Sequence, residues 1–110
     1  MAQFGIGENM VLIKVIRNSK GNLISICDKG ALGKIYRDQT YCLDLIKYRK
    51  FYEGESLDSF EDVGSLLKNA SSINAVGSKS INLLKKYGFD TTNAKKIGKE
   101  EMKHLQIYRI

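Results

Sequence analysis

Hydrophobic residues recur at two different spacings along the chain, and the first half shows mostly the spacing of strands. The segments 10–17 (MVLIKVIR) and 22–27 (NLISIC) are rich in β-branched residues, and the turn cluster NSKGN separates them. This pattern predicts an N-terminal β-hairpin. Residues 40–52 begin with strict alternation and predict a third strand, whereas 28–36, with two glycines, predicts a loop.

The second half contains two segments with helical spacing. The first follows a capping residue at Asp58 or Ser59. The second spans 77–88, with an apolar stripe that includes Ile81 and Leu84, and with Gly88 at the position of a left-handed C-terminal glycine. Residues 71–76 are expected to form only a short link between these helices.

Weak alternation in 104–110 predicts a last strand, so the expected order is β-β-β-α-α-β. This order predicts an α+β fold, in which the N-terminal β-hairpin and further strands form a sheet packed by two helices. A length of 110 residues fits one domain, expected at 10–110 after a flexible N-terminal tail at 1–9.

The N-terminus lacks the basic region and long apolar core of a secretory signal. No apolar run approaches the ~20 residues that a membrane span needs. We therefore expect a cytoplasmic protein with no membrane partner.

Charge is distributed unevenly along the chain, whose net charge is +6. Two basic segments flank the acidic stretch 53–62 (EGESLDSFED), which contains acids and no base. A basic excess of this size favours a polyanionic partner such as RNA. The alternative interpretation is a solvated, lysine-rich surface.

The cysteines and the single histidine do not form a metal-binding pattern. Cys27 and Cys42 are not part of a C-x-x-C pair, and His104 is the only imidazole. We therefore predict no metal and no cofactor. Both cysteines are expected to be small buried residues, with a disulfide as the minor alternative.

The sequence GSKS at the start of the second helix could hold a phosphate. A helix that begins after Gly77 leaves free N–H groups and a positive dipole end, to which Ser78, Lys79 and Ser80 add hydroxyls and a charge. The full phosphate-loop pattern of nucleotide hydrolases is absent, because residue 72 is serine. An ordinary helix start is the alternative. A second candidate anion-binding turn, at 27–34, is better explained as a strand-ending turn with Asp28 as a hydrogen-bond acceptor.

Two further groups of residues are candidates for RNA contact. Helical spacing places a polar, basic face opposite the apolar stripe, with Lys79, Asn82, Lys85 and Lys86. The stretch 46–55 interleaves cations with aromatic rings, which suits single-stranded RNA. Its candidate residues are Lys47, Tyr48, Arg49 and Lys50. For each group the alternative is structural: a solvated face in the first, core aromatic rings in the second.

Several motifs together resemble a small archaeal family, the domain of unknown function numbered 424. They are VLIKVI, ICDKGALGKIY, FYEGE, SINAVGSKSINLLKKYGF and the tail KIG…HLQIYRI, and they cover about 10–110. The resemblance includes Asn74-x-Val76-Gly77 and His104-x-Gln106. It implies an archaeal cytoplasmic protein with a link to RNA or translation. Separately, residues 73–89 are similar to the second half of a helix-hairpin-helix, which binds nucleic-acid backbones.

The sequence hypothesis is therefore an RNA-binding protein of the archaeal translation apparatus, with no catalytic residues. Ribosomal RNA would be its partner, together with ribosomal proteins, and it could be a component of a ribosomal subunit. One alternative is a small enzyme acting on RNA or a nucleotide through His104 and an aspartate such as Asp28 or Asp44. Another is a protein-interaction module that docks through the acidic loop 53–62.

Overall fold

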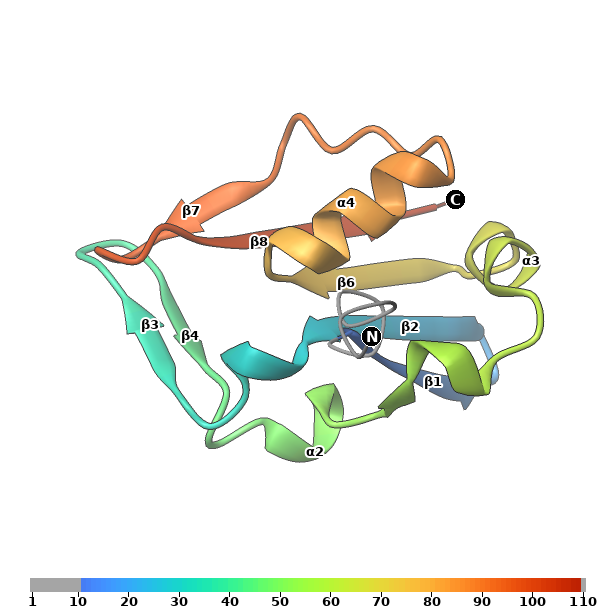
Figure 1. The fold of residues 1–110 in the computed structure, drawn as a ribbon, viewed down its shortest axis with the longest axis horizontal. Coiled ribbons are helices and arrows are strands. Elements are labelled where there is room, and N and C mark those ends of the chain that lie inside the picture. Colours follow the sequence, from blue (N-terminus) through green and yellow to red (C-terminus); the bar gives the residue numbers. More distant parts are fainter. Residues whose placement is uncertain (1–10, 110) are drawn as a thin grey trace, which may run out of the picture.

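The computed structural model describes residues 11–109, and the expected tail at 1–9 lies outside them. The chain folds into a six-stranded mixed sheet with the two longest helices on one face, and a small two-stranded sheet and a short helix on the other (Figure 1). This arrangement confirms the α+β class. The strands of the large sheet lie in the order β5 (Glu55–Ser56), β1 (Val11–Asn18), β2 (Gly21–Asp28), β6 (Ser72–Val76), β8 (Met102–Tyr108) and β7 (Lys95–Ile97).

The N-terminal hairpin is confirmed, because β1 and β2 pair in antiparallel register along their whole length. The largest difference from the sequence prediction is the strand next to β2 in the sheet. The expected link at 71–76 is the central strand β6, which pairs with β2 in parallel and with β8 in antiparallel orientation. The predicted last strand is confirmed as β8, shifted by two residues, and its edge partner β7 was not predicted.

The predicted strand over 40–52 is wrong beyond residue 44. β4 (Cys42–Asp44) pairs only with β3 (Ile35–Arg37), which lies in a segment that was expected to be a loop. The Asp44 carboxylate then accepts hydrogen bonds from the backbone N–H groups of Ile46 and Lys47. This side-chain turn ends the strand, and the short helix α2 (Arg49–Tyr52) follows.

The first predicted helix starts later than expected. Residues Leu57–Ser59 form η2, one turn of 3-10 helix, instead of the start of an α-helix. A similar turn, η1, spans Lys29–Ala31. Helix α3 (Val63–Lys68) is capped by Asp62, which accepts from the Ser65 N–H at 3.0 Å. The capping positions predicted at Asp58 and Ser59 are therefore wrong.

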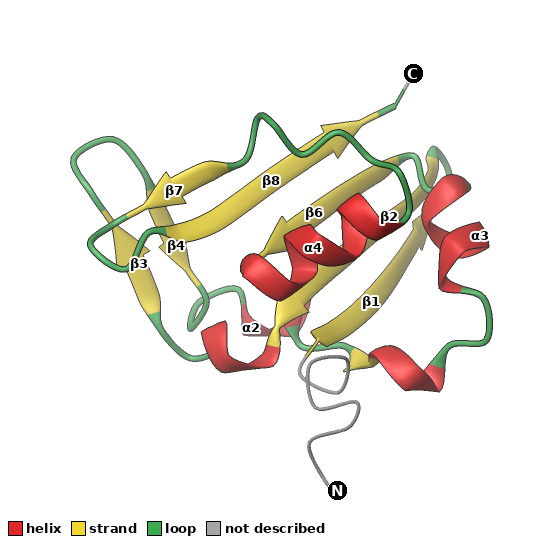
Figure 2. Ribbon diagram, turned by 45° about the horizontal axis from the view of Figure 1, so that its top comes forward, coloured by secondary structure: helices red, strands yellow, loops and turns green. Residues whose placement is uncertain are grey.

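The second helix, α4 (Ser78–Lys86), agrees with the prediction, including a left-handed Gly88 after its end. Figure 2 shows α3 and α4 on the same side of the sheet. The apolar residues of these helices pack there on alternate residues of the central strands, such as Ile24, Ile26 and Ile73. A second cluster on the opposite face joins Val76 and Ile97 to the β3–β4 pair and to Tyr52 of α2.

No helix within residues 11–109 is long and apolar enough to cross a membrane.

Candidate nucleic-acid interface

The N-terminus of α4 is occupied by a carboxylate of the same chain. Asp28, the last residue of β2, accepts hydrogen bonds from the N–H groups of Lys79 (3.1 Å) and Ser80 (2.8 Å) and from the Ser80 hydroxyl (2.8 Å). These are the free amides that a phosphate would use. The geometry therefore gives no support to the prediction that an RNA phosphate binds these amides and Ser80, because Asp28 already supplies an anion there.

Gly77 makes the approach of Asp28 possible. Its backbone has φ 104° and ψ 157°, a conformation that is essentially restricted to glycine. A Cβ at this position would lie 2.1 Å from the Asp28 Cγ. Gly77 is also buried, and its N–H donates to the Lys103 carbonyl at 2.8 Å. It joins β2, α4 and β8, and its burial gives no support to the predicted contact between Gly77 and RNA.

The polar face of α4 is exposed, as its spacing predicts. Ser78, Lys79, Asn82, Lys85 and Lys86 are all exposed, whereas the apolar stripe of the helix is buried. This arrangement leaves the side chains of these five residues available to a partner, although the backbone amides behind them are used.

The basic, aromatic stretch is not extended: a turn leads into the short helix α2, which corrects the expected alternation of its side chains. Lys47 and Tyr48 are exposed, with the Lys47 ammonium 5.3 Å from the centre of the Tyr48 ring. Arg49 instead forms an ion pair with Glu53 at 3.0 Å. Lys50 is exposed, and its backbone carbonyl accepts a hydrogen bond from the Lys14 ammonium. Lys47, Tyr48 and Lys50 therefore remain open to a partner, whereas Arg49 is largely neutralised.

A close group of lysines outside any salt bridge lies on the hairpin of β7 and β8, which sequence reasoning missed. Lys96 lies directly opposite Lys103 in the antiparallel register, and Lys95 lies opposite His104. Like charges in such cross-strand positions destabilise a sheet. Among residues 11–109, the Arg49–Glu53 pair is the single salt bridge, so no described carboxylate forms a salt bridge with Lys96 or Lys103. The close run of lysines at 95, 96, 99 and 103 was the signal available in the sequence.

This hairpin and α4 belong to one surface. The contact between the Gly77 N–H and the Lys103 carbonyl joins the start of α4 to the start of β8. Lys103 and Leu105 are two residues apart on β8, so their side chains lie on the same face of the sheet, and Leu105 packs in the core beneath α4. Lys96 and Lys103 therefore project on the side of the sheet that carries α4 and its first lysine, Lys79. We call Lys79, Lys96 and Lys103 the lysine cluster.

On the opposite face, His104 is held in a buried hydrogen-bond network. The Asn74 Oδ1 accepts from the Tyr52 hydroxyl at 3.1 Å and contacts the His104 Nε2 at 3.1 Å. Because a carbonyl oxygen only accepts, the Nε2 carries the hydrogen and the Nδ1 is an acceptor. Burial, with Lys95 as a smaller cause, lowers the pKa of His104 below its ordinary value. Burial also raises the pKa of Tyr52 to about 12.

This network does not form the catalytic pair of the enzyme alternative. The described partner of His104 is the amide Asn74, whereas Asp28 is bound to α4 and Asp44 to the turn after β4. No group of three or more His, Cys, Asp or Glu side chains within residues 11–109 could hold a metal ion. The geometry gives no support to a histidine–aspartate enzyme.

The acidic stretch 53–62 is not an open loop. Glu55 and Ser56 form β5 at the edge of the sheet, and Asp62 caps α3. Glu53 is paired with Arg49. The structural roles of Glu53 and Asp62 weaken the alternative of an acidic docking loop.

The two cysteines differ from each other. Cys27 is buried, as expected, and its burial, with a smaller effect of the neighbouring Asp28, raises the pKa of its thiol to about 12. Cys42 is exposed, which corrects the expectation that both are buried. Both are free thiols, so the minor alternative of a disulfide between them is wrong.

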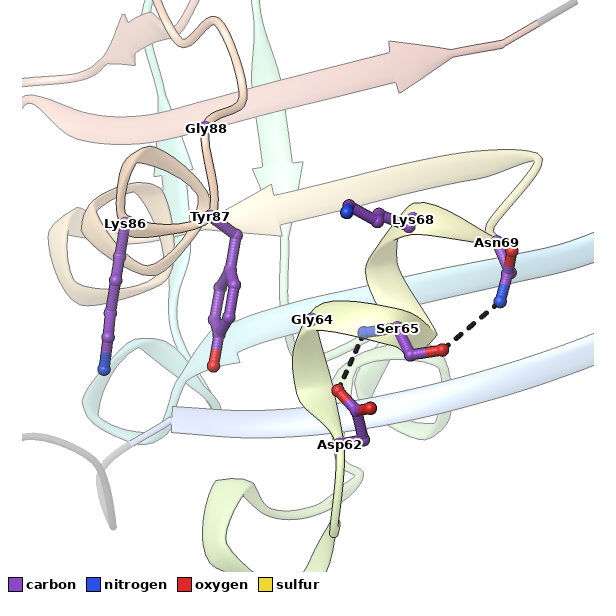
Figure 3. A pocket seen from close by; sticks show the side chains of 8 residues that line it. All are labelled: Asp62, Gly64, Ser65, Lys68, Asn69, Lys86, Tyr87 and Gly88. Carbon is purple, nitrogen blue, oxygen red and sulfur yellow. Dashed lines mark hydrogen bonds between the residues drawn. The ribbon is translucent and has the colours of Figure 1, made fainter.

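A hollow of about 710 Å³ lies between α3 and the C-terminal end of α4 (Figure 3). Lys68, Lys86 and Tyr87 contribute to its walls. Its other polar groups already have partners, since Asp62 binds the Ser65 N–H and the Ser65 hydroxyl accepts from Asn69 at 3.4 Å. These bonds stabilise α3, so the hollow offers few free groups for recognition.

A second hollow, of about 330 Å³, lies over β7 and β8 on the face that carries the β3–β4 pair. Its polar and aromatic lining is Tyr41, Asn93, Lys95, His104, Gln106 and Tyr108. We call it the β8 groove.

Comparisons with known proteins identify the fold but no function. No protein-family model matches the sequence, and no curated protein matches it. The chain is similar in fold to an uncharacterized conserved protein from Methanopyrus kandleri, whose crystal structure gives a TM-score of 0.71 over 91% of each chain, at 19% sequence identity.

Proposed function

We propose that the protein binds RNA through phosphate contacts made by the lysine cluster and by the exposed lysines along α4. The observation that carries this proposal is the placement of Lys96 directly opposite Lys103 without an acidic partner among the described residues. A repulsive pair of this kind lowers stability, and a bound polyanion would relieve it. Such contacts position a protein on RNA without reading its sequence.

Other features of the chain are consistent with this proposal. Within residues 11–109 a single one of the 18 lysines and arginines is engaged in a salt bridge. Lys79, Lys85 and Lys86 extend the positive surface along α4. An edge strand can also carry lysines to prevent pairing with another chain. That explanation accounts for Lys95 and Lys96 on β7, but it does not require Lys103 on the inner strand β8.

A narrower proposal places the protein in the translation apparatus, with ribosomal RNA and ribosomal proteins as its partners. It rests on the family resemblance. Sedimentation of native lysate tests it: migration with a ribosomal subunit at low salt is expected, and migration as a free small protein would contradict it.

RNA affinity should fall steeply with salt if the lysines contact phosphates. Because each contact releases counterions, the affinity should drop roughly tenfold or more between about 50 and 200 mM salt when several phosphates are bound. Fluorescence anisotropy with a labelled single-stranded RNA measures this directly. An affinity that does not change with salt, or no binding at low salt, would refute the proposed function.

A further inference from the structure

The floor of the β8 groove consists of three residues on one side of a strand. His104, Gln106 and Tyr108 alternate along β8, so their side chains project to the same face. Tyr41 stands beside them, and Lys95 fixes it: the Lys95 ammonium donates to the Tyr41 hydroxyl at 2.9 Å and lies 4.3 Å from the ring centre. One wall of the groove therefore carries an aromatic ring and a positive charge in contact with each other.

Tyr108 is the most exposed large hydrophobic side chain among the described residues, with 73% of its surface accessible. Tyr41 lines the same groove and is 41% exposed. Aromatic rings are normally buried in a small domain because they contribute much of its hydrophobic stabilisation. Two exposed rings in one groove, beside a lysine, form the combination on which unpaired bases stack.

The groove also presents hydrogen-bonding groups at its floor. Gln106 and Asn93 each bring a side-chain amide, which has both a donor and an acceptor. The Nδ1 of His104 is an acceptor, because Asn74 and Tyr52 fix the hydrogen on Nε2. Planar amides and a ring acceptor can pair with the edge of a base, as happens in single-stranded RNA recognition.

The volume of the groove matches a ligand of modest size. Small-ligand pockets span roughly 300–1,000 Å³, and at about 330 Å³ the β8 groove lies at the lower end of this range. It can accept one base with its sugar, but not a duplex. Lys95 lines the groove and belongs to the strand that also carries Lys96 of the lysine cluster.

We infer that the β8 groove binds an unpaired nucleobase of single-stranded RNA, which stacks on Tyr108 or Tyr41 while Gln106 and His104 contact its edge. This inference rests on the proposed RNA binding and adds the class of RNA. The lysine cluster contacts phosphates in single strands and duplexes alike, whereas the groove distinguishes between them.

The test compares Tyr108→Ala with the native chain on two probes, a short unstructured single-stranded RNA and an RNA duplex of the same length. Loss of one stacking contact should lower the single-strand affinity about 5- to 150-fold. Duplex affinity should change by less than about twofold, because the phosphate contacts remain. Tyr108→Phe retains the ring and should bind like the native chain, whereas Tyr108→Leu, which is apolar without a stacking ring, should resemble Tyr108→Ala.

Three results would overturn the inference. They are equal affinity of Tyr108→Ala and the native chain for the single strand, an equal loss for both probes, and Tyr108→Leu binding as well as Tyr108→Phe. In each of these cases RNA binding by the lysine cluster stands. If the native chain binds neither probe at low salt, the proposed function fails together with the groove inference.

Discussion

Replacing Gly77 by alanine is expected to lower the free energy of unfolding by about 3 kcal/mol or more. The substitution forces a side chain into a backbone conformation that essentially only glycine adopts. It also places a Cβ against the Asp28 carboxylate, which must then leave the amides of Lys79 and Ser80. Thermal and urea unfolding measure the change.

Gly88 offers a matched control, because it also has positive φ (86°) but nothing lies within 4 Å of a Cβ built there. Gly88→Ala should therefore cost only about 1 kcal/mol, the price of backbone strain alone. Asp28→Asn retains the shape of the cap without its charge and should give an intermediate loss. If Gly77→Ala were no more destabilising than Gly88→Ala, the Asp28 cap would not be the contact that joins β2 to α4.

The double variant Lys96→Gln/Lys103→Gln should weaken RNA binding and stabilise the protein. Removing two phosphate contacts should lower the affinity on the order of tenfold at low salt and reduce the slope of log affinity against log salt by about 1.4 for a single strand. Removing the cross-strand repulsion should raise the free energy of unfolding by up to about 1 kcal/mol. A substitution that lowers RNA affinity and raises the free energy of unfolding is expected where the replaced residues are retained for a charged partner.

Lys20→Gln is the control for this variant. Lys20 is exposed in the turn between β1 and β2, at the opposite end of the sheet from the pair of Lys96 and Lys103. It should leave both the affinity and the salt slope nearly unchanged. The proposal would be contradicted if the double variant bound RNA like the native chain, or if Lys20→Gln had an equal effect.

Local signals explain which elements the sequence predicts correctly. The hairpin of β1 and β2 has a turn cluster between two β-branched runs, and α4 has both a helical apolar stripe and its closing Gly88. Each of these signals lies within a few residues of the structure that it specifies. The exposed face of α4 could be predicted for the same reason.

The missed elements depend on contacts between distant segments. β6 has only five residues, two of which are Ser72 and Asn74, so its sequence resembles a polar link. It becomes a strand because it fits between β2 and β8, where Ile73 and Ala75 are buried. β7 is similarly short and carries two lysines, so pairing with β8 is what makes it a strand.

The sequence also did not reveal the Asp28 cap or the β8 groove, because both are formed by segments far apart in the chain. GSKS has the composition of an anion-binding helix start, but the anion that fills it belongs to Asp28, 51 residues away from Lys79. In the β8 groove, Tyr41 and Tyr108 come from opposite halves of the chain. The i, i+2, i+4 spacing of His104, Gln106 and Tyr108 was visible in the sequence. Because strand β7 was not predicted, the sequence did not indicate that these residues face a groove.

The most direct measurement of the central claim is a titration of the isotopically labelled chain with single-stranded RNA at low salt, followed through its backbone amide signals. We predict that the largest shifts occur in β7 and β8, around Lys96 and Lys103, with smaller shifts on the exposed face of α4. The Ser80 amide, held by Asp28, should change little. Shifts confined to the β1–β2 turn or to the acidic stretch 53–62, or no shifts at all, would contradict RNA binding through the lysine cluster.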